Sequence, residues 1–229
     1  MRVDVVDLEG CGTATGTVVV IDVLRAFTTA ALAFAAGAVE IRPVATIEEV
    51  FAAREADPTL LAMGEIEGMP VDGFDFDNSP AALVARADEV AGRVLVQRTT
   101  AGTQGLVRSV AAERLYAASF VNAGATARRI ARDAPEAVTF VVSGRDAERD
   151  GDEDLACAEY LAALLRDEAP DPAPYLARIA PATVGRQFLD PDHPYPVEDM
   201  AFARDLDRVP LALVVERRDG RLVMHAEPA

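Results

Sequence analysis

The chain has 229 residues, and its 51% hydrophobic and 26% charged content excludes an intrinsically disordered protein. Its formal net charge of −16 argues against nucleic acid and anionic membrane surfaces as partners. No apolar stretch is long and uncharged enough to span a bilayer, and the acidic N-terminal residues are unlike a signal peptide, so we expect a cytoplasmic protein.

The content of Cys, His and Lys limits the chemistry further. Cys11 and Cys157 have no CxxC or Cys/His partner nearby, and both are expected to be buried or incidental thiols. His193 and His225 lie apart in the sequence, so there are few histidines for a His-based metal site or a Ser-His-Asp triad. All basic residues are Arg, so a phosphate or sulfonate must be held by Arg, backbone N–H groups or a metal.

The first 37 residues predict an edge strand, a turn, a buried strand and a helix. Residues 2–7 alternate weakly, and the Gly/Thr-rich residues 10–16 favour a turn over a phosphate loop because a strand follows them. The β-branched run of residues 18–21 ends at Asp22, and the Ala-rich segment after Arg25 predicts a helix that ends near Gly37. Asp22 and Arg25 therefore lie at the carboxyl end of a strand, where ligands bind in open α/β sheets.

Strands and helices alternate along most of the remaining chain. Strands are expected at 39–44, 59–63, 93–97, 115–118 and 137–142. Helices are expected at 46–56 and 123–133, and three further helices are expected to begin at residue 80, to end at about residue 112 and to end at residue 166, respectively. Ser79 and Pro80 predict an N-cap and first helical position. Residues 175–208 favour irregular helices, and a hairpin is expected around Asp219-Gly220.

This alternation predicts a largely parallel sheet covered on both faces, and the late hairpin makes the sheet mixed. We therefore expect a single α/β domain over residues 1–229, with residues 170–229 as a C-terminal helical extension and terminal hairpin of that domain. A homodimer is compatible with such a chain.

Polar side chains follow five of the predicted strands, and a parallel sheet would bring them to one rim. They are Asp22 and Arg25; Glu65 with Asp72, Asp75 and Asp77; Thr99, Thr100, Gly102 and Thr103; Ser119 and Asn122; and Ser143, Gly144 and Arg145. Each group alone has a plainer explanation, and Asp22, Thr103 and Asn122, for example, could simply be helix caps. Glu153 and Asp154, which follow soon after, are most simply the solvated first turn of a helix.

The cluster suits phosphoryl transfer or hydrolysis. Carboxylates favour Mg²⁺, and the Thr-Thr-x-Gly-Thr sequence at the start of a helix offers hydroxyl and backbone N–H groups to a phosphate or sulfonate. Arg25 and Arg98 could add charge-assisted hydrogen bonds. Residues 75–79 also look like the nucleophile loop of haloacid-dehalogenase-type phosphatases, but the directly preceding apolar strand and the required Lys are absent.

Several spaced motifs together resemble the 2-phosphosulfolactate phosphatase family. They are Asp22-Val23-Leu24-Arg25-Ala26, Gly64-Glu65, Gly73-Phe74-Asp75 with Asn78-Ser79-Pro80, Thr99-Thr100-x-Gly102-Thr103, and Ala118-Ser119 with Asn122. The resemblance runs from Val18 to about Leu164 and weakens after Pro170. It implies a three-layer α/β/α sandwich and a Mg²⁺-dependent phosphatase that hydrolyses 2-phospho-3-sulfolactate to 3-sulfolactate and phosphate, a step toward coenzyme M.

The resemblance also implies a division of roles. Asp22, Glu65 and Asp75 would be the metal-bound carboxylates and, with Arg25, the catalytic residues. Phosphate or sulfonate would be bound by Arg25 and by the loop residues Thr99, Thr100, Gly102 and Thr103. Asn78 and Asn122 would orient the substrate, and Ser79 and Ser143 would also bind substrate or phosphate.

The sequence departs from the family pattern at three places, and the first two bear on the substrate. The family's usual TTNGT is TTAGT here, with Ala101 in place of Asn, and its usual GNSP has Asp77 in place of Gly. An acidic residue often found soon after the Pro is replaced by Ala81 and Ala82. Two alternatives therefore stay open: a non-catalytic binding protein for a small phosphorylated or sulfonated acid, and an enzyme that uses the same rim for another phosphoester.

Overall fold

The computed structural model describes residues 1–146, 148–190 and 195–228. Its strands are β1 (Arg2–Asp7), β2 (Gly16–Ile21), β3 (Glu40–Pro43), β4 (Leu61–Gly64), β5 (Val94–Arg98), β6 (Ala112–Ala118), β7 (Ala137–Val142), β8 (Leu211–Arg218) and β9 (Arg221–Pro228). The longer helices are α1 (Ala26–Ala35), α2 (Ile47–Ala56), α6 (Ala123–Asp133) and α7 (Asp152–Leu165). The shorter ones are α3 (Pro80–Ala85), α4 (Ala87–Val90), α5 (Gly102–Arg108), α8 (Ala173–Leu176), α9 (Thr183–Gln187) and α10 (Asp199–Ala203), with 3₁₀ turns at Gly10–Thr13 and Phe120–Asn122.

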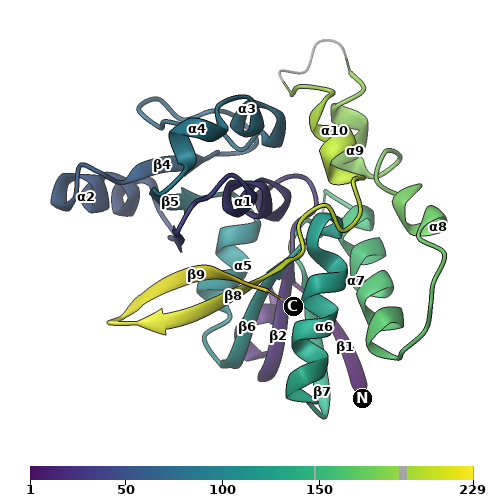
Figure 1. The fold of residues 1–229 in the computed structure, drawn as a ribbon. Helices are drawn as coiled ribbons and strands as arrows, with labels where there is room; N and C mark the ends of the chain where they lie inside the picture. The colour runs from purple at the N-terminus through teal and green to yellow at the C-terminus, as the bar shows by residue number, and fades with distance from the viewer. Residues whose placement is uncertain (147, 191–194, 229) are drawn as a thin grey trace.

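Helices cover both faces of a mixed, mostly parallel sheet, so the predicted α/β sandwich is confirmed (Figure 1). The order of the described strands is β1-β7-β2-β6-β8-β9-β3-β5-β4. Val18 and Val20 of β2 pack in one buried cluster with side chains of α1 and α5, whereas Val19 and Ile21 pack in a second cluster with side chains of α6 and α7. This alternation is that of a strand buried on both faces.

The C-terminal hairpin lies inside the sheet, where it joins two parallel blocks. The first block is β1-β7-β2-β6 and the second is β3-β5-β4. Between them, β8 is antiparallel to β6 and to β9, and β9 is antiparallel to β3. Three antiparallel pairings make the second block run opposite to the first.

The expectation that the predicted strand ends share one rim of one parallel sheet is therefore wrong. β9 and β3 pair through Ile41 and Met224, and Figure 1 shows the two blocks at a steep angle with α1 between them. The side chain of Gln97 in β5 donates to the Ala26 carbonyl at the start of α1 (3.1 Å). The carboxyl ends of the two blocks thus meet at α1 because the sheet bends.

Several local predictions are confirmed. β1 is an edge strand, Thr46 forms a capping box with Glu49 at the start of α2, and Ser79 caps α3 ahead of Pro80. Asp219 and Gly220 both have positive φ, as a tight β8–β9 turn requires.

The boundaries of some other elements differ from those that the sequence predicts. The helix expected to reach about residue 112 ends at Arg108, and β6 already begins at Ala112. The irregular region contains α8, α9 and α10, while residues 191–194, His193 among them, lie outside the described residues. Among the described helices, none has the length and apolar character needed to cross a membrane.

The position of the hairpin yields a stability prediction. Leu213 in β8 is fully buried between Ala117 of β6 and Ala226 of β9. We expect Leu213→Ala to lower the free energy of unfolding by about 2–5 kcal/mol, since a large side chain is removed at the junction of the two blocks. Urea unfolding measures the change. Arg218→Ala, at the exposed end of the same strand, is the control, and an equal loss in both variants would contradict the prediction.

Candidate functional site

A cavity of about 490 Å³ opens where the two parallel blocks meet. Its described lining includes five acidic side chains and two arginines, together with apolar and amide groups from the C-terminal half of the chain. The charged residues are Asp22, Arg25, Glu65, Glu67, Asp146, Glu148 and Arg149; the others include Leu24, Gly68, Asn78, Thr100, Ala101, Val184, Gln187, Phe188 and Tyr195. The cavity is thus more acidic than basic before any ligand enters.

Asp22 follows β2 directly and is only 6% exposed. Its carboxylate accepts a hydrogen bond from the Ala26 N–H (2.9 Å) at the start of α1 and lies 3.4 Å from the Ser143 hydroxyl. Burial raises its pKa to about 6 from an ordinary value of 3.8, the Ala26 N–H opposes this rise, and the charge of Glu65 adds to it. Asp22 is therefore a cavity carboxylate that takes up a proton close to neutral pH.

Gly102 lies against this carboxylate. A Cβ at Gly102 would be 2.7 Å from both Asp22 Oδ2 and the Cβ of Ala26. The glycine of the Thr-Thr-x-Gly-Thr sequence is thus needed for the close approach of α5 to Asp22.

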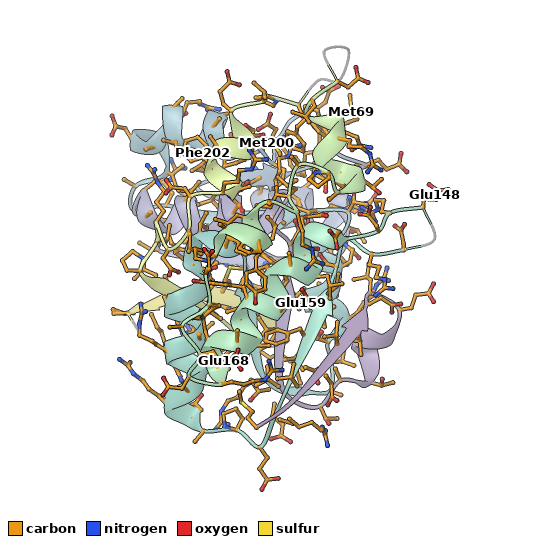
Figure 2. All side chains as sticks on the ribbon, turned by 90° about the vertical axis from the view of Figure 1, so that its right-hand side faces the viewer. Met69, Glu148, Glu159, Glu168, Met200 and Phe202 are labelled. Carbon is orange, nitrogen blue, oxygen red and sulfur yellow. The ribbon has the colours of Figure 1, made fainter. Side chains whose placement is uncertain are left out.

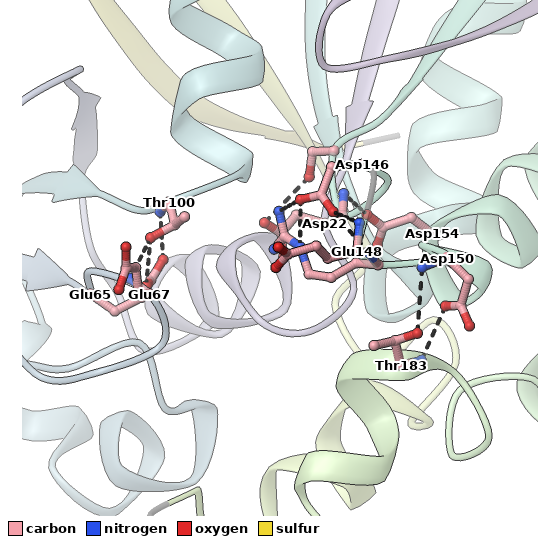
Figure 3. Close-up of polar contacts among 12 residues, drawn as sticks. Asp22, Glu65, Glu67, Thr100, Asp146, Glu148, Asp150, Asp154 and Thr183 are labelled. Carbon is pink, nitrogen blue, oxygen red and sulfur yellow. Dashed lines mark hydrogen bonds and ion pairs between the residues drawn. The ribbon is translucent and has the colours of Figure 1, made fainter.

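Glu153 and Asp154 are buried, which corrects the expectation of a solvated first turn. Each is 1% exposed. Asp154 accepts hydrogen bonds from the Val23 N–H (2.7 Å) and the Gly144 N–H (2.8 Å), and so ties α7 to the ends of β2 and β7. Figure 3 shows Asp154 beside Asp22.

Burial also raises the pKa values of these two carboxyls. The pKa of Glu153 rises to about 7, with a contribution from the charge of Asp22, and that of Asp154 rises well above its ordinary value because of burial and the charges of Glu153 and Asp22. Glu153 Oε2 is buried and has no hydrogen-bond partner among the described residues. The three carboxyls therefore favour a bound proton or cation.

Glu65 connects two loops at the other side of the cavity (Figure 3). Its carboxylate accepts hydrogen bonds from the Thr100 N–H (2.5 Å), the Thr100 hydroxyl (2.9 Å) and the Gly68 N–H (2.5 Å). The Thr100 hydroxyl in turn accepts from the Glu67 N–H (2.7 Å). Glu65 lines the cavity, as its position after β4 predicts, but its oxygens already hold the loop after β4 against the loop after β5.

The hydroxyls of Thr99 and Thr103 bond within their own loop. The Thr99 hydroxyl accepts from the Thr103 N–H (3.0 Å), and the Thr103 hydroxyl lies 2.8 Å from the Thr99 N–H. Both residues are buried and neither lines the cavity. They shape the start of α5 instead of presenting hydroxyls to a ligand.

Asn78 and Ser79 separate into two roles. Asn78 lines the cavity, is 4% exposed, and its Oδ1 has no hydrogen-bond partner among the described residues. Ser79 caps α3 and donates to Asp199 (2.7 Å). Asp77 accepts a hydrogen bond from the Ser79 N–H (2.9 Å) and is absent from the cavity lining, so its carboxylate stabilises this turn.

Arg25 forms a buried ion pair with Asp199 of α10. The Nη1–Oδ2 distance is 2.9 Å, and the two side chains are 6% and 0% exposed. Arg25 Nη2 also donates to the Gly68 carbonyl (3.2 Å), and the guanidinium lies over the rings of Tyr195 (4.2 Å to the centroid) and Phe188 (5.5 Å). The C-terminal segment therefore completes the site around Arg25.

Seven of the predicted site residues are not among the residues that line the cavity: Ser79, Thr99, Gly102, Thr103, Ser143, Asp75 and Asn122. Asp75 is 29% exposed, accepts from the Ala62 N–H (2.8 Å) and pairs with Arg54 (3.5 Å). Asn122 is fully buried and accepts from the Ser119 N–H (2.9 Å) at a chain reversal after β6. Both stabilise local structure, and Asp75 is left out of the metal site discussed below.

Sequence reasoning missed Asp199, Tyr195 and Arg149. Asp199 and Tyr195 come from the segment after Pro170, where no strand–helix alternation points to a site. Arg149 lies in the loop between β7 and α7, and its Nε donates to Asp146 (2.8 Å). Glu148 of the same loop extends from the right of Figure 2. The run of charges in residues 145–154 was the available signal.

The carboxylate oxygens at the cavity suit a cation that takes part of its coordination from a bound substrate. No three Asp, Glu, His or Cys side chains of the described ranges converge as a complete metal site. Mg²⁺, however, is commonly bound by one or two carboxylates and completes its shell with water and phosphate oxygens. Asp22 in the cavity and the unpartnered Oε2 of Glu153 behind it are compatible with that arrangement.

The fold and the cavity define an α/β protein with a carboxylate-rich ligand site at the carboxyl ends of its parallel strands. The family described as 2-phosphosulpholactate phosphatase matches residues 5–185. The chain belongs to this family, whose name denotes phosphoric monoester hydrolases.

Curated relatives extend the match along most of the chain. The chain is 34% identical over 187 residues, 80% of each chain, to a probable 2-phosphosulfolactate phosphatase of Bacillus subtilis (strain 168). A protein with the same description from Carboxydothermus hydrogenoformans is 34% identical over 220 residues, which cover 91% of this chain and 90% of the relative. One from Deinococcus radiodurans is 41% identical over 149 residues, which cover 63% and 61%.

The contact between Gly102 and Asp22 yields a prediction. Gly102→Ala would place a Cβ 2.7 Å from Asp22 Oδ2, so we expect a loss of about 1–3 kcal/mol in the free energy of unfolding. The control is Gly12→Ala, whose Cβ would meet only the Arg108 carbonyl at 3.6 Å. Thermal or urea unfolding compares the two, and equal stability of both variants would refute the close approach.

The buried carboxyls yield a pH prediction. The pKa of Glu153 is about 7 in the folded chain and near 4.5 when unfolded, so between these pH values the folded state binds the extra proton and stability falls as pH rises. We expect Glu153→Gln to match the wild type near pH 4.5 and to become more stable than it by about 3 kcal/mol at pH 8, in chelator, since each pKa unit corresponds to about 1.4 kcal/mol. Urea unfolding at both pH values measures this. Glu168→Gln, which removes an exposed carboxylate beyond the same helix, is the control, and a difference that does not change with pH would rule the effect out.

Proposed function

We propose that this chain is a cytoplasmic, Mg²⁺-dependent phosphatase that hydrolyses a small anionic phosphomonoester, with 2-phospho-3-sulfolactate as the first candidate. The products would be 3-sulfolactate and phosphate, which suits a step toward coenzyme M. The observation that carries the proposal is Asp22, a buried carboxylate at the end of β2 that faces a 490 Å³ cavity in a chain of this family.

The charge of the cavity supports the need for a cation. A phosphomonoester is an anion, and the described lining already has five acids against two arginines, one of which is neutralised by Asp199. An anionic substrate would be repelled unless positive charge enters with it. Bound Mg²⁺ would supply that charge against the phosphate oxygens and polarise the phosphoryl group.

The chain's own residues would have distinct tasks. Asp22 would hold the cation, with Glu153 as the buried carboxylate behind it, since Glu65 already accepts three hydrogen bonds. The amide oxygen of Asn78, which has no hydrogen-bond partner among the described residues, would orient the substrate or a water molecule. Arg25, fixed by Asp199, would direct its remaining N–H donors to an anionic group of the substrate.

Asp77 and Ala101, the two departures from the family pattern that bear on the substrate, differ in how far they support the two alternative functions, a binding protein and an enzyme for another phosphoester. Asp77 is bonded to the Ser79 N–H and is not part of the cavity lining, so it gives little support to a non-catalytic binding protein. Ala101 does line the cavity, where the family's usual Asn would place an amide. A changed phosphoester substrate is the alternative that this position favours.

Phosphate release from a panel of small phosphoesters, with and without Mg²⁺, tests the proposal. We expect Mg²⁺-dependent release, highest with 2-phospho-3-sulfolactate, and a fall of at least about 100-fold in kcat for Asp22→Asn because the variant loses the cavity carboxylate. Asp88→Asn, on the exposed surface of α4, is the matched control.

Each other outcome has a definite meaning. Release from other esters alone would keep the reaction and change the substrate. Thermal stabilisation by ligands without any release would favour the binding protein, and an unchanged rate in Asp22→Asn would remove Asp22 from the mechanism.

A further inference from the structure

Asp199 is a fully buried carboxylate from the C-terminal segment, beyond the residues 5–185 that match the family. Its Oδ2 binds Arg25 Nη1 (2.9 Å), and its Oδ1 accepts from the Ser79 hydroxyl (2.7 Å) and the Ala81 N–H (3.0 Å). One side chain thus contacts both the turn after β2 and the start of α3. In Figure 2, Met200 of α10 and Met69 of the loop after β4 lie at the same upper end of the molecule.

The contacts of Arg25 constrain its guanidinium from several sides. Asp199 and the Gly68 carbonyl use two of its N–H donors, and the Tyr195 and Phe188 rings flank it. A buried ion pair adds little net stability compared with a well-packed apolar pair, because both charges lose their hydration. Its clearest effect here is geometric, since it fixes the direction of a cation that lines the cavity.

The C-terminal segment has other anchors. Asp207 accepts a hydrogen bond from the Gly124 N–H (2.6 Å), its own N–H binds the Phe120 carbonyl (3.1 Å), and the Val209 N–H binds the Val121 carbonyl (2.8 Å). These bonds hold the segment against the start of α6 independently of Asp199. Docking of the segment therefore does not require a carboxylate at position 199.

We propose that Asp199 is a positioning residue for the reaction: it acts through Arg25 and holds the guanidinium toward an anionic group of the bound phosphoester. The inference rests on the proposed function for its substrate class. Asp199 itself is not among the residues that line the cavity, so it does not touch the substrate.

The test compares Asp199→Asn with Asp207→Asn. The first removes the charge beside Arg25 but keeps an oxygen for Ser79 and Ala81; the second removes a carboxylate of the same segment that binds a backbone N–H. Asp207 has φ of +54°, which Asn tolerates well. We expect kcat/KM and the affinity for inorganic phosphate, measured by calorimetry, to fall about 10- to 100-fold in Asp199→Asn and by less than about twofold in Asp207→Asn.

A double variant shows whether Asp199 acts through Arg25. In an Arg25→Gln background, adding Asp199→Asn should change kcat/KM and phosphate affinity by less than about twofold, because the group being positioned is already absent. A further fall as large as in the wild-type background would overturn the inference, and so would equal effects of Asp199→Asn and Asp207→Asn.

A third variant covers loss of folding. If Asp199→Asn does not fold, Asp199→Glu keeps the charge beside Arg25 and displaces the carboxylate by one methylene. A folded Asp199→Glu with about tenfold lower phosphate affinity supports positioning, whereas wild-type affinity refutes it.

The outcomes separate this inference from the proposed function. A wild-type chain that binds phosphate but hydrolyses no ester refutes the phosphatase, while the phosphate affinities still test Asp199. A wild-type chain that hydrolyses esters and is unaffected by Asp199→Asn refutes the positioning role alone. A wild-type chain that does neither refutes both.

Discussion

The ion pair of Arg25 with Asp199 is the contact on which the rest of the site depends. It joins the turn after β2, the loop after β4 and the segment around α10, which lie far apart in the sequence. Because both charges are buried, removal of either one would leave the other without compensation in a medium of low polarity. This ion pair therefore couples the turn and the loop to the C-terminal segment, which Asp207 also anchors at the start of α6.

A second constraint is the burial of like charges. Burial raises the pKa of Asp22, which lines the cavity, and of Glu153 and Asp154, and the charge of Asp22 adds to the rise at both of the latter. Helix N-termini and backbone N–H groups compensate only part of this cost, as at Val23 and Ala26. Such carboxyls destabilise the folded chain at neutral pH, and their placement at a cavity is understandable where a ligand or cation supplies the opposite charge.

The site divides into residues that face the cavity and residues that hold them. Asp22, Asn78 and Arg25 face it, and of these only Asn78 has an unpartnered buried oxygen among the described residues. Glu65 lines the cavity but bonds to Thr100 and Gly68, so its main effect is to keep two loops in register. Sequence motifs do not separate these groups, because both kinds of residue follow strands at similar spacings.

The sequence by itself determined the local elements and the reaction class. The β-branched run before Asp22, the caps at Thr46 and Ser79 and the turn at Gly220 depend on contacts within a few residues, so their patterns predicted them. Only the tertiary structure decided that the hairpin reverses the sheet between two blocks, that Glu153 is buried and that Asp199 completes the site. Each of these depends on pairing or packing between segments distant in the sequence, for which hydrophobic periodicity carries no information.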